Sequence, residues 1–285
     1  MPRTRSDLEA VLRLLDEPDA KRAESVVSRL AQWELGDIEK LREASTGLGD
    51  AAKRNLDALY ARARFGALNA RWQELTTRRP IDLELALLCI AKTALPGADD
   101  TQTTGALNEL ANRVGARLCG DRAFDVGLDS LCRVLREHGL TGNAADFYNP
   151  LNSYLPSVLD RGLGIPISLG SIAILVGQRL QLPVYGVGTP GHFLCFYGEP
   201  AIPSGAFFDP FSGFVRISRV EVERRIREAG AVPQPWMFSP VNEREIVART
   251  LRNLIAIFRT TGAAENADRL LGWLEVLINH GQTRP

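Results

Sequence analysis

The stretch from residue 163 to residue 211 constrains the fold more than any other part of the chain. Residues 167–180 are apolar or small on nearly every side, which predicts a buried helix. Pro166 suits the start of that helix, because a proline there gives up no hydrogen bond. After Pro183 the hydrophobic period becomes that of strands, and the short connections favour antiparallel pairing. We expect the strands at 184–188, 192–197, 206–209 and 214–217. The stretch therefore predicts an α+β core, with a central helix packed on a small antiparallel sheet.

Apolar residues at helical spacing dominate the chain on both sides of this core. Residues 1–79 predict paired helices, one of them ended by Gly36 and the last a long helix over 51–77. The pairing resembles HEAT-type repeat units weakly, and an irregular helical cap on the next domain is the alternative. The first region of the chain is thus expected to be a helical bundle.

Two further regions are expected after this bundle. Residues 80–230 hold the core behind a helical lead-in that Asp82 caps. Residues 231–285 predict an extended linker at 233–240 and then a helical hairpin of tetratricopeptide-like shape, its first helix starting at Ser239 and Pro240. The chain as a whole is expected to be mostly helical.

Composition narrows the function classes. Lysine and arginine number 34, and aspartate and glutamate also number 34, so no basic excess points to nucleic acid. The N-terminus lacks an apolar signal core and no run is long enough to span a bilayer, which predicts a cytoplasmic protein without membrane contact. The four cysteines are dispersed and lie mostly in apolar runs, as buried free thiols do; they are Cys89, Cys119, Cys132 and Cys195. With only three histidines, we expect neither a metal site nor a cofactor.

One histidine and one carboxylate stand out within the core. His192 begins a predicted strand, and Asp209 ends the next one seventeen residues later. A histidine and a carboxylate on neighbouring strands are two members of a nucleophilic triad, in which the carboxylate fixes the tautomer of the imidazole. We therefore expect a hydrogen bond between His192 and Asp209 in one pocket. The alternatives are a core histidine beside a turn and a carboxylate that caps the turn before Pro210.

Several motifs in this order resemble the SirB-type transglutaminase-like family of bacterial proteins, whose core also occurs in some F-box proteins. The motifs are Asn152-Ser153-Tyr154-Leu155, Gly164-Ile165-Pro166-Ile167-Ser168-Leu169, Leu182-Pro183, Tyr185-Gly186-Val187, Pro190-Gly191-His192-Phe193 and Asp209-Pro210-Phe211. The resemblance covers about residues 80–220 well. It implies a papain-like core in which active members carry a cysteine at the N-terminus of the central helix, a histidine on one strand, and an aspartate or asparagine on the next.

The position of that cysteine falls around Pro166 to Ser168, where this chain has none. Ser168 is the nearest hydroxyl and the first candidate nucleophile, ahead of Ser171 one turn further in, although a serine in a first helical turn usually satisfies a free backbone N–H. Cys195 is excluded by alternation, because it lies three residues beyond His192 on the same strand.

Other residues of the matching motifs are candidates for the pocket. Asn152, Ser153 and Tyr154 lie in a loop expected to pass near the cleft, or else Asn152 or Ser153 caps the helix that follows. Pro166 and Tyr185 are expected in the wall of the pocket.

Three hypotheses follow for the function. The first is a non-catalytic transglutaminase-like protein that binds a protein or peptide, or acts as a regulatory module, through the pocket around His192 and Asp209. The second is a cysteine-less hydrolase or acyltransferase that uses Ser168 with His192 and Asp209. The third is a helical-repeat adaptor in which the core only stabilises the scaffold. The missing cysteine favours the first.

Overall fold

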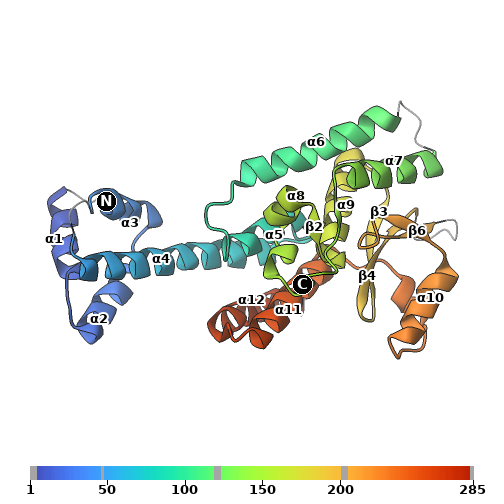
Figure 1. Cartoon of the computed structure of the whole chain (residues 1–285). Coiled ribbons are helices and arrows are strands. Elements are labelled where there is room, and N and C mark those ends of the chain that lie inside the picture. Colours follow the sequence, from blue (N-terminus) through green and yellow to red (C-terminus); the bar gives the residue numbers. More distant parts are fainter. Residues whose placement is uncertain (1–4, 46–47, 119–122, 200–204, 283–285) are drawn as a thin grey trace. The chain divides into compact units, whose positions relative to one another are not determined.

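The computed structural model describes residues 5–45, 48–118, 123–199 and 205–282, so Cys119 lies outside the described residues. The chain is divided into two compact units, Met1–Glu74 and Leu75–Pro285. Helices and two small sheets make up these units, which confirms the predicted α+β class (Figure 1). Within the described ranges, every helix is too short or too polar to cross a membrane.

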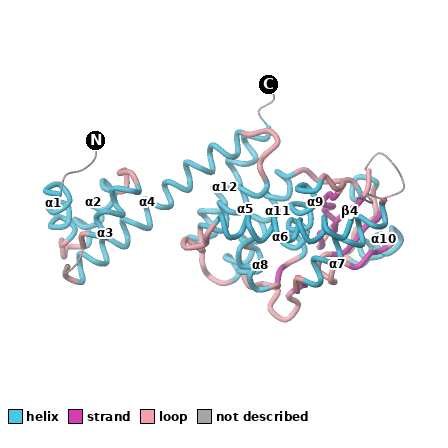
Figure 2. The backbone as a smooth tube through the Cα atoms, turned by 90° about the horizontal axis from the view of Figure 1, so that it is seen from above, coloured by secondary structure: helices cyan, strands magenta, loops and turns pink. Residues whose placement is uncertain are grey.

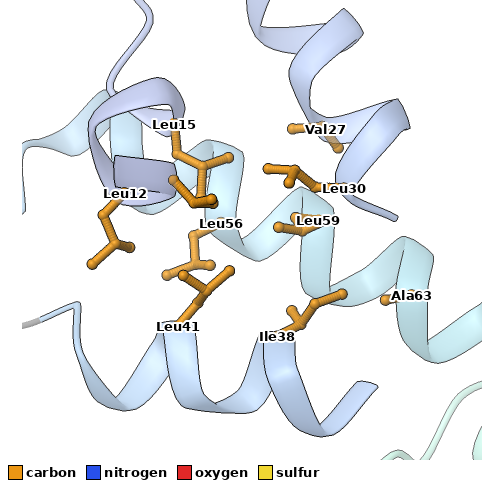
Figure 3. Close-up of a cluster of buried hydrophobic side chains, with 10 residues drawn as sticks. Leu12, Leu15, Val27, Leu30, Ile38, Leu41, Leu56, Leu59 and Ala63 are labelled. Atoms are coloured by element: carbon orange, nitrogen blue, oxygen red, sulfur yellow. The ribbon is translucent and has the colours of Figure 1, made fainter. Parts of the chain in front are cut away.

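The first unit is a helical bundle. It is formed by α1 (Arg5–Leu15), α2 (Ala20–Leu30), α3 (Leu35–Glu43) and most of α4 (Asp50–Thr77). Figure 3 shows its core, to which each of the four helices contributes leucine or other aliphatic side chains. Burial of these apolar groups is the main force that holds such a bundle together. Whether the helices form HEAT-type repeats remains a prediction.

Gly36 does not end a helix, contrary to the prediction. The second helix ends at Leu30, and Gly36 is the second residue of α3. The reason is tertiary packing: Ile38 and Leu41 of α3 are fully buried. Their burial outweighs the modest cost of a glycine in the first turn.

The second unit places its helices around α9 (Pro166–Leu180). The lead-in helices are α5 (Leu83–Lys92), α6 (Asp100–Leu118), α7 (Phe124–Glu137) and α8 (Leu155–Arg161). Asp82 caps α5 as predicted, because its Oδ1 accepts a hydrogen bond from the Leu85 N–H at 3.0 Å. Residues 166–177 of α9 are all buried, and Pro166 stands in its first turn. This helix is the buried central helix that the sequence predicted.

One face of α9 packs on a four-stranded antiparallel sheet. The strands β3 (Val184–Thr189), β4 (His192–Tyr197), β5 (Ala206–Asp209) and β6 (Val215–Ile217) pair in sequence order. Glycines allow the close approach: a Cβ on Gly170 of α9 would lie 2.7 Å from Phe193 Cε1, and a Cβ on Gly186 of β3 would lie 2.4 Å from Phe193 Cζ. A second sheet consists of β1 (Thr141–Gly142) and β2 (Leu163–Gly164), which pair in parallel.

The other face of the larger sheet is covered by α10 (Arg219–Glu228) and the 3-10 helix η2 (Pro235–Phe238). Leu194 and Phe196 of β4 pack there in one apolar cluster with Val222 and Ile226 of α10. Figure 2 shows the strands gathered between α9 and α10. The segment 233–240 was predicted as an extended linker, but η2 forms within it because Met237 is buried in the same cluster.

The C-terminal helices α11 (Glu243–Thr260) and α12 (Ala264–Gln282) form the predicted hairpin. Its first helix begins at Glu243 and not at Ser239 and Pro240. Asn242 caps it, accepting from the Glu245 N–H while the Glu245 carboxylate accepts from the Asn242 N–H. This reciprocal capping sets the start more strongly than a proline can.

The hairpin is an integral part of the second unit. Helix α11 packs against α5, α9 and the 3-10 helix η1 (Pro150–Ser153). At its far end, His280 Nδ1 lies 2.8 Å from Thr76 Oγ1, and Arg244 Nη2 donates to the Thr76 carbonyl at 2.7 Å. The last helix thus contacts the first residues of the same unit. The finer predicted boundaries, at 79 and at 230, remain predictions.

Candidate functional site

His192 and Asp209 meet at one end of the larger sheet. His192 is the first residue of β4 and Asp209 the last of β5, and these strands are antiparallel neighbours. His192 Nε2 lies 3.1 Å from Asp209 Oδ1, which is the hydrogen bond expected from the sequence. The imidazole is 24% exposed, whereas the carboxylate is 1% exposed. The pair therefore presents its histidine to the outside and keeps its carboxylate inside.

Four further hydrogen bonds hold the buried carboxylate. Arg225 of α10 donates to Oδ2 at 2.6 Å, and the Ser212 hydroxyl donates to the same atom at 2.7 Å. The N–H groups of Phe211 and Ser212 donate to Oδ1 at 3.0 and 3.3 Å. Burial by itself would raise the pKa of Asp209, but the hydrogen bonds from His192, Arg225 and Ser212 hold that pKa well below its ordinary value. Asp209 is therefore a carboxylate whose charge Arg225 offsets.

The hydrogen bond to Asp209 fixes the tautomer of His192. A carboxylate only accepts, so Nε2 carries a proton, and in the neutral ring Nδ1 is then the acceptor. Among the described residues, no group bonds Nδ1. His192 thus has a free lone pair, which could accept a proton in catalysis or a hydrogen bond from a ligand.

The N-terminus of α9 offers no free nucleophile. The Ser168 hydroxyl lies 2.6 Å from the Asn152 carbonyl and 3.0 Å from the Ile165 carbonyl, and it accepts from the Ile165 N–H at 3.1 Å. Its one proton is therefore engaged by backbone carbonyls, and one of its two lone pairs accepts a backbone N–H. Ser171, one turn further on, donates to the Ile167 carbonyl at 2.8 Å. Both serines have the contacts of structural hydroxyls.

Cys195 lies on the opposite face of β4 from His192, as alternation predicts. It is fully buried, and its Sγ lies 3.8 Å from the Gly170 carbonyl of α9. Burial raises the pKa of this thiol well above its ordinary value. Cys195 is therefore a protonated core thiol. Cys132 is also a free, buried thiol, and Cys89 is buried as well.

A hollow of about 210 Å³ opens beside His192, and we call it the His192 pocket. Its wall is mostly apolar and comes from the start of α9, the start of β4, one face of α11 and the loop before η1. The lining residues are Phe147, Tyr148, Ile165, Pro166, Ile167, Gly191, His192, Phe193, Arg249, Asn253, Ala256 and Ile257. Prolyl and isoleucyl groups thus line the pocket at the N-terminus of α9, where this chain has no cysteine.

Of the other residues predicted for the pocket, Pro166 lines it and four lie elsewhere. Asn152 and Ser153 belong to η1 and Tyr154 follows it at the start of α8; all three are buried and are not among the lining residues of the pocket. Tyr185 lines a different hollow, together with Gln178 and Glu243.

Asn152 and Ser153 do not cap α8, contrary to the prediction. The cap position is Tyr154, without a side-chain hydrogen bond. Asn152 instead ties η1 to the loop before it, since its amide donates to the Asp146 carbonyl at 2.7 Å and its Oδ1 accepts from Asn143 at 3.1 Å. The chain first forms the 3-10 turn η1, which places Asn152 and Ser153 before the start of the helix.

Arg249 is, like Arg225, a residue of this site that the sequence did not single out. It lies on α11, and its Nη2 donates to the carbonyls of His192 at 2.7 Å and Thr189 at 3.1 Å. Its Cζ is 5.8 Å from the centroid of the Phe193 ring. The sequence signal that could have identified Arg249 is its position as a charged residue in the mostly apolar run from Ile246 to Leu251.

Among the described residues, no three His, Cys, Asp or Glu side chains gather as the ligands of a metal ion would.

Comparison with known proteins gives the family. The model of the family described as "Transglutaminase-like superfamily" matches residues 101–252, which is more than half of the chain. The chain belongs to the transglutaminase-like superfamily. The match covers α9, the larger sheet, α10 and the start of α11, so it contains both His192 and Asp209.

Several known proteins are similar to this chain in sequence. A UPF0162 protein of Xylella fastidiosa (strain 9a5c) is 39% identical over 148 residues, or 48% of this chain and 52% of that protein. The UPF0162 protein PA3419 of Pseudomonas aeruginosa is 32% identical over 201 residues, or 68% of this chain and 73% of that protein. The human "F-box only protein 21" is 27% identical over 157 residues, or 53% of this chain and 25% of that protein.

The chain thus spans about half the length of the first of these relatives. No solved structure matches the chain.

Proposed function

We propose that this chain is a non-catalytic member of the transglutaminase-like superfamily, of the SirB type, and that it binds a peptide or protein segment in the His192 pocket. One observation carries the proposal. The residues at the N-terminus of α9 that line the pocket are Ile165, Pro166 and Ile167, and the nearest hydroxyl, that of Ser168, is bonded to backbone. The pocket thus has the histidine of an acyl-transfer site and an apolar wall in place of a nucleophile.

The state of Asp209 supports the same proposal. In a triad the carboxylate stabilises the imidazolium that forms during the reaction. Here Arg225 donates to Asp209 and offsets its charge, which lowers that stabilisation. The hydrogen bonds around Asp209 fit a role in fixing the position of the His192 ring.

A second candidate function is a cysteine-less hydrolase or acyltransferase that uses Ser168 with His192 and Asp209. The observation in its favour is the free Nδ1 of His192, which leaves a base available. It would require the Ser168 hydroxyl to leave three backbone partners.

Turnover and binding measured together separate the two functions. We would incubate wild type and the His192→Ala and Ser168→Ala variants with a fluorophosphonate probe, a peptide-hydrolysis library and an amine-incorporation assay. We expect no labelling of Ser168 and no turnover. Turnover that both variants lose while their circular dichroism is unchanged would establish the hydrolase and overturn the binding proposal.

The binding part of the test uses a substitution that fills the pocket with a large side chain. Ala256 lies on α11, is exposed and lines the pocket, so Ala256→Trp should block it. Ala264 is also exposed, at the start of α12, and Ala264→Trp is the matched control. On an array of random peptides, we expect the first variant to lose the peptides that wild type retains and the control to keep them. Equal retention by the two variants would place binding outside the pocket and contradict the proposal.

A further inference from the structure

Arg249 has a charge that no neighbouring acid offsets. Its side chain is partly buried, and among the described residues no carboxylate pairs with it. Burial and the nearby Arg252 lower the pKa of Arg249, but a guanidinium stays protonated at any physiological pH. Nη2 has two carbonyl partners, and the remaining donors of the guanidinium have none among the described residues. A partly buried cation of this kind is stabilised by any anion that reaches it.

This cation stands in the wall of a small, mostly apolar pocket. Arg249 and Asn253 are one helical turn apart on α11, and Ala256 and Ile257 continue the same face along the pocket. The volume of about 210 Å³ is below the roughly 300–1,000 Å³ of pockets that enclose whole drug-sized ligands. A pocket of this volume suits a single residue, with one apolar side chain and the polar group next to it.

The polar groups of the pocket match the end of a polypeptide. A C-terminal residue has a carboxylate, which a guanidinium and an Asn amide can bind, and a backbone N–H, which the free Nδ1 of His192 can accept. Asp209 does not repel the carboxylate, because its charge faces Arg225 and the Ser212 hydroxyl. An aspartate or glutamate side chain would supply the anion but not the adjoining apolar group.

Two aromatic residues extend the surface beyond the pocket. Phe147 is 38% exposed and Tyr148 is 71% exposed, their ring centroids are 5.4 Å apart, and both line the pocket. Exposed aromatic rings next to a hollow are typical of binding surfaces. They offer a contact for the residues that precede the terminal one, which a small carboxylic acid would not use.

We propose that the His192 pocket binds the C-terminal residue of a polypeptide, with Arg249 holding its carboxylate and the apolar wall holding an apolar side chain. This inference rests on the proposed binding function and names its ligand. Capture of a C-terminal carboxylate is a recurring mode of peptide recognition.

The decisive comparison changes only the end of the ligand. We would prepare fluorescein-labelled peptides with random upstream residues and a last residue fixed as Leu, Phe, Asp or Lys, each as free acid and as amide. Fluorescence polarisation with wild type should show the acids ending in Leu or Phe bound at least about tenfold more tightly than their amides. Acids ending in Asp or Lys should bind more weakly than these.

Variants of α11 test the assigned cation. Arg249→Gln should bring the affinity for the acids close to that for the amides, and Arg249→Lys should restore part of the difference because it keeps the charge. The control is Arg252→Gln, one turn along the same helix and exposed, which should bind like wild type. Because the acid and amide series is read on wild type, the test stands even if Arg249→Gln fails to fold.

The outcomes separate this inference from the function on which it rests. Acids and amides that bind equally well, or a preference for acids that survives Arg249→Gln, would overturn C-terminal capture and leave a peptide-binding pocket standing. Absence of binding by every peptide, whatever its end, would overturn both proposals.

Discussion

Replacing Asp209 by asparagine removes a charge from the most heavily bonded side chain of the site. The carboxylate is 1% exposed and accepts five hydrogen bonds, two of them from His192 and Arg225. The asparagine side chain has the same shape. Its NH2 group, however, replaces one of the two carboxylate oxygens, both of which accept hydrogen bonds, so this group faces N–H or O–H donors. Arg225 then has no buried counter-charge.

The magnitude follows from the exposure of the two partners. Removing one member of a buried ion pair costs about 3–5 kcal/mol. The Arg225 side chain is 30% exposed and also bonds Glu221, so water and that carboxylate recover part of the loss. We therefore expect Asp209→Asn to lower the free energy of unfolding by about 3 kcal/mol, at the lower end of that range.

The control is a carboxylate with one exposed partner. Asp125 pairs with Arg216 at 2.9 Å, and their side chains are 71% and 55% exposed. Exposed pairs contribute about 0–1 kcal/mol, so Asp125→Asn should unfold almost as wild type does. Urea unfolding followed by circular dichroism measures both variants. Hydrogen–deuterium exchange of residues 205–217 locates the loss at the site.

The effect should depend on pH in a defined direction. Because the pKa of Asp209 is lower in the folded than in the unfolded chain, its contribution is complete above about pH 4 and is lost as the pH falls further. The difference in stability between wild type and Asp209→Asn should therefore be complete at about pH 5 and shrink as the pH falls below about 4. A loss no larger than that of Asp125→Asn, or a difference that persists unchanged into acid, would refute this account of the carboxylate.

Three further predictions concern packing. Gly186→Ala should destabilise the chain by about 1–3 kcal/mol, because the new methyl group meets the Phe193 ring, whereas Gly105→Ala, with open space around it in α6, should leave thermal unfolding unchanged or raise its midpoint. Cys195 should resist labelling by Ellman's reagent in the folded protein and react only in urea, since its thiol is buried and its pKa is raised; fast labelling without denaturant would contradict this. Ser153→Ala should be neutral or stabilise by about 1 kcal/mol, because its buried Oγ has no hydrogen-bond partner among the described residues, and a loss in chemical denaturation would show that a partner exists.

The parts of the fold that the sequence predicted well are those set by local pattern. The helix over 166–180 has small and apolar residues on nearly every side until Gln178, and the alternation after Pro183 indicates strands whose order follows from short loops. His192 and Asp209 could be placed together because each stands at the end of one of these strands.

The parts that were not predicted depend on contacts distant in sequence. Arg225 reaches Asp209 from a helix whose exposed face looks like any charged surface, and Arg249 reaches the carbonyl of His192 across 57 residues. The predicted N-cap of α8 was wrong for a related reason. The 3-10 turn that places Asn152 before the start of α8 is held by hydrogen bonds to Asn143 and Asp146. Propensity alone does not report such partners.

The contact between the last helix and the first residues of the second unit has a consequence for the order of folding during synthesis. Thr76 and His280 lie 204 residues apart in sequence, and α11 forms part of the wall of the His192 pocket. A ribosome adds residues one at a time from the N-terminus, so the central helix and the sheet emerge long before the helices that complete their packing. Until then, the apolar side of α9 that meets α11 stays uncovered. During that period the nascent chain exposes apolar core residues, which are a binding surface for chaperones.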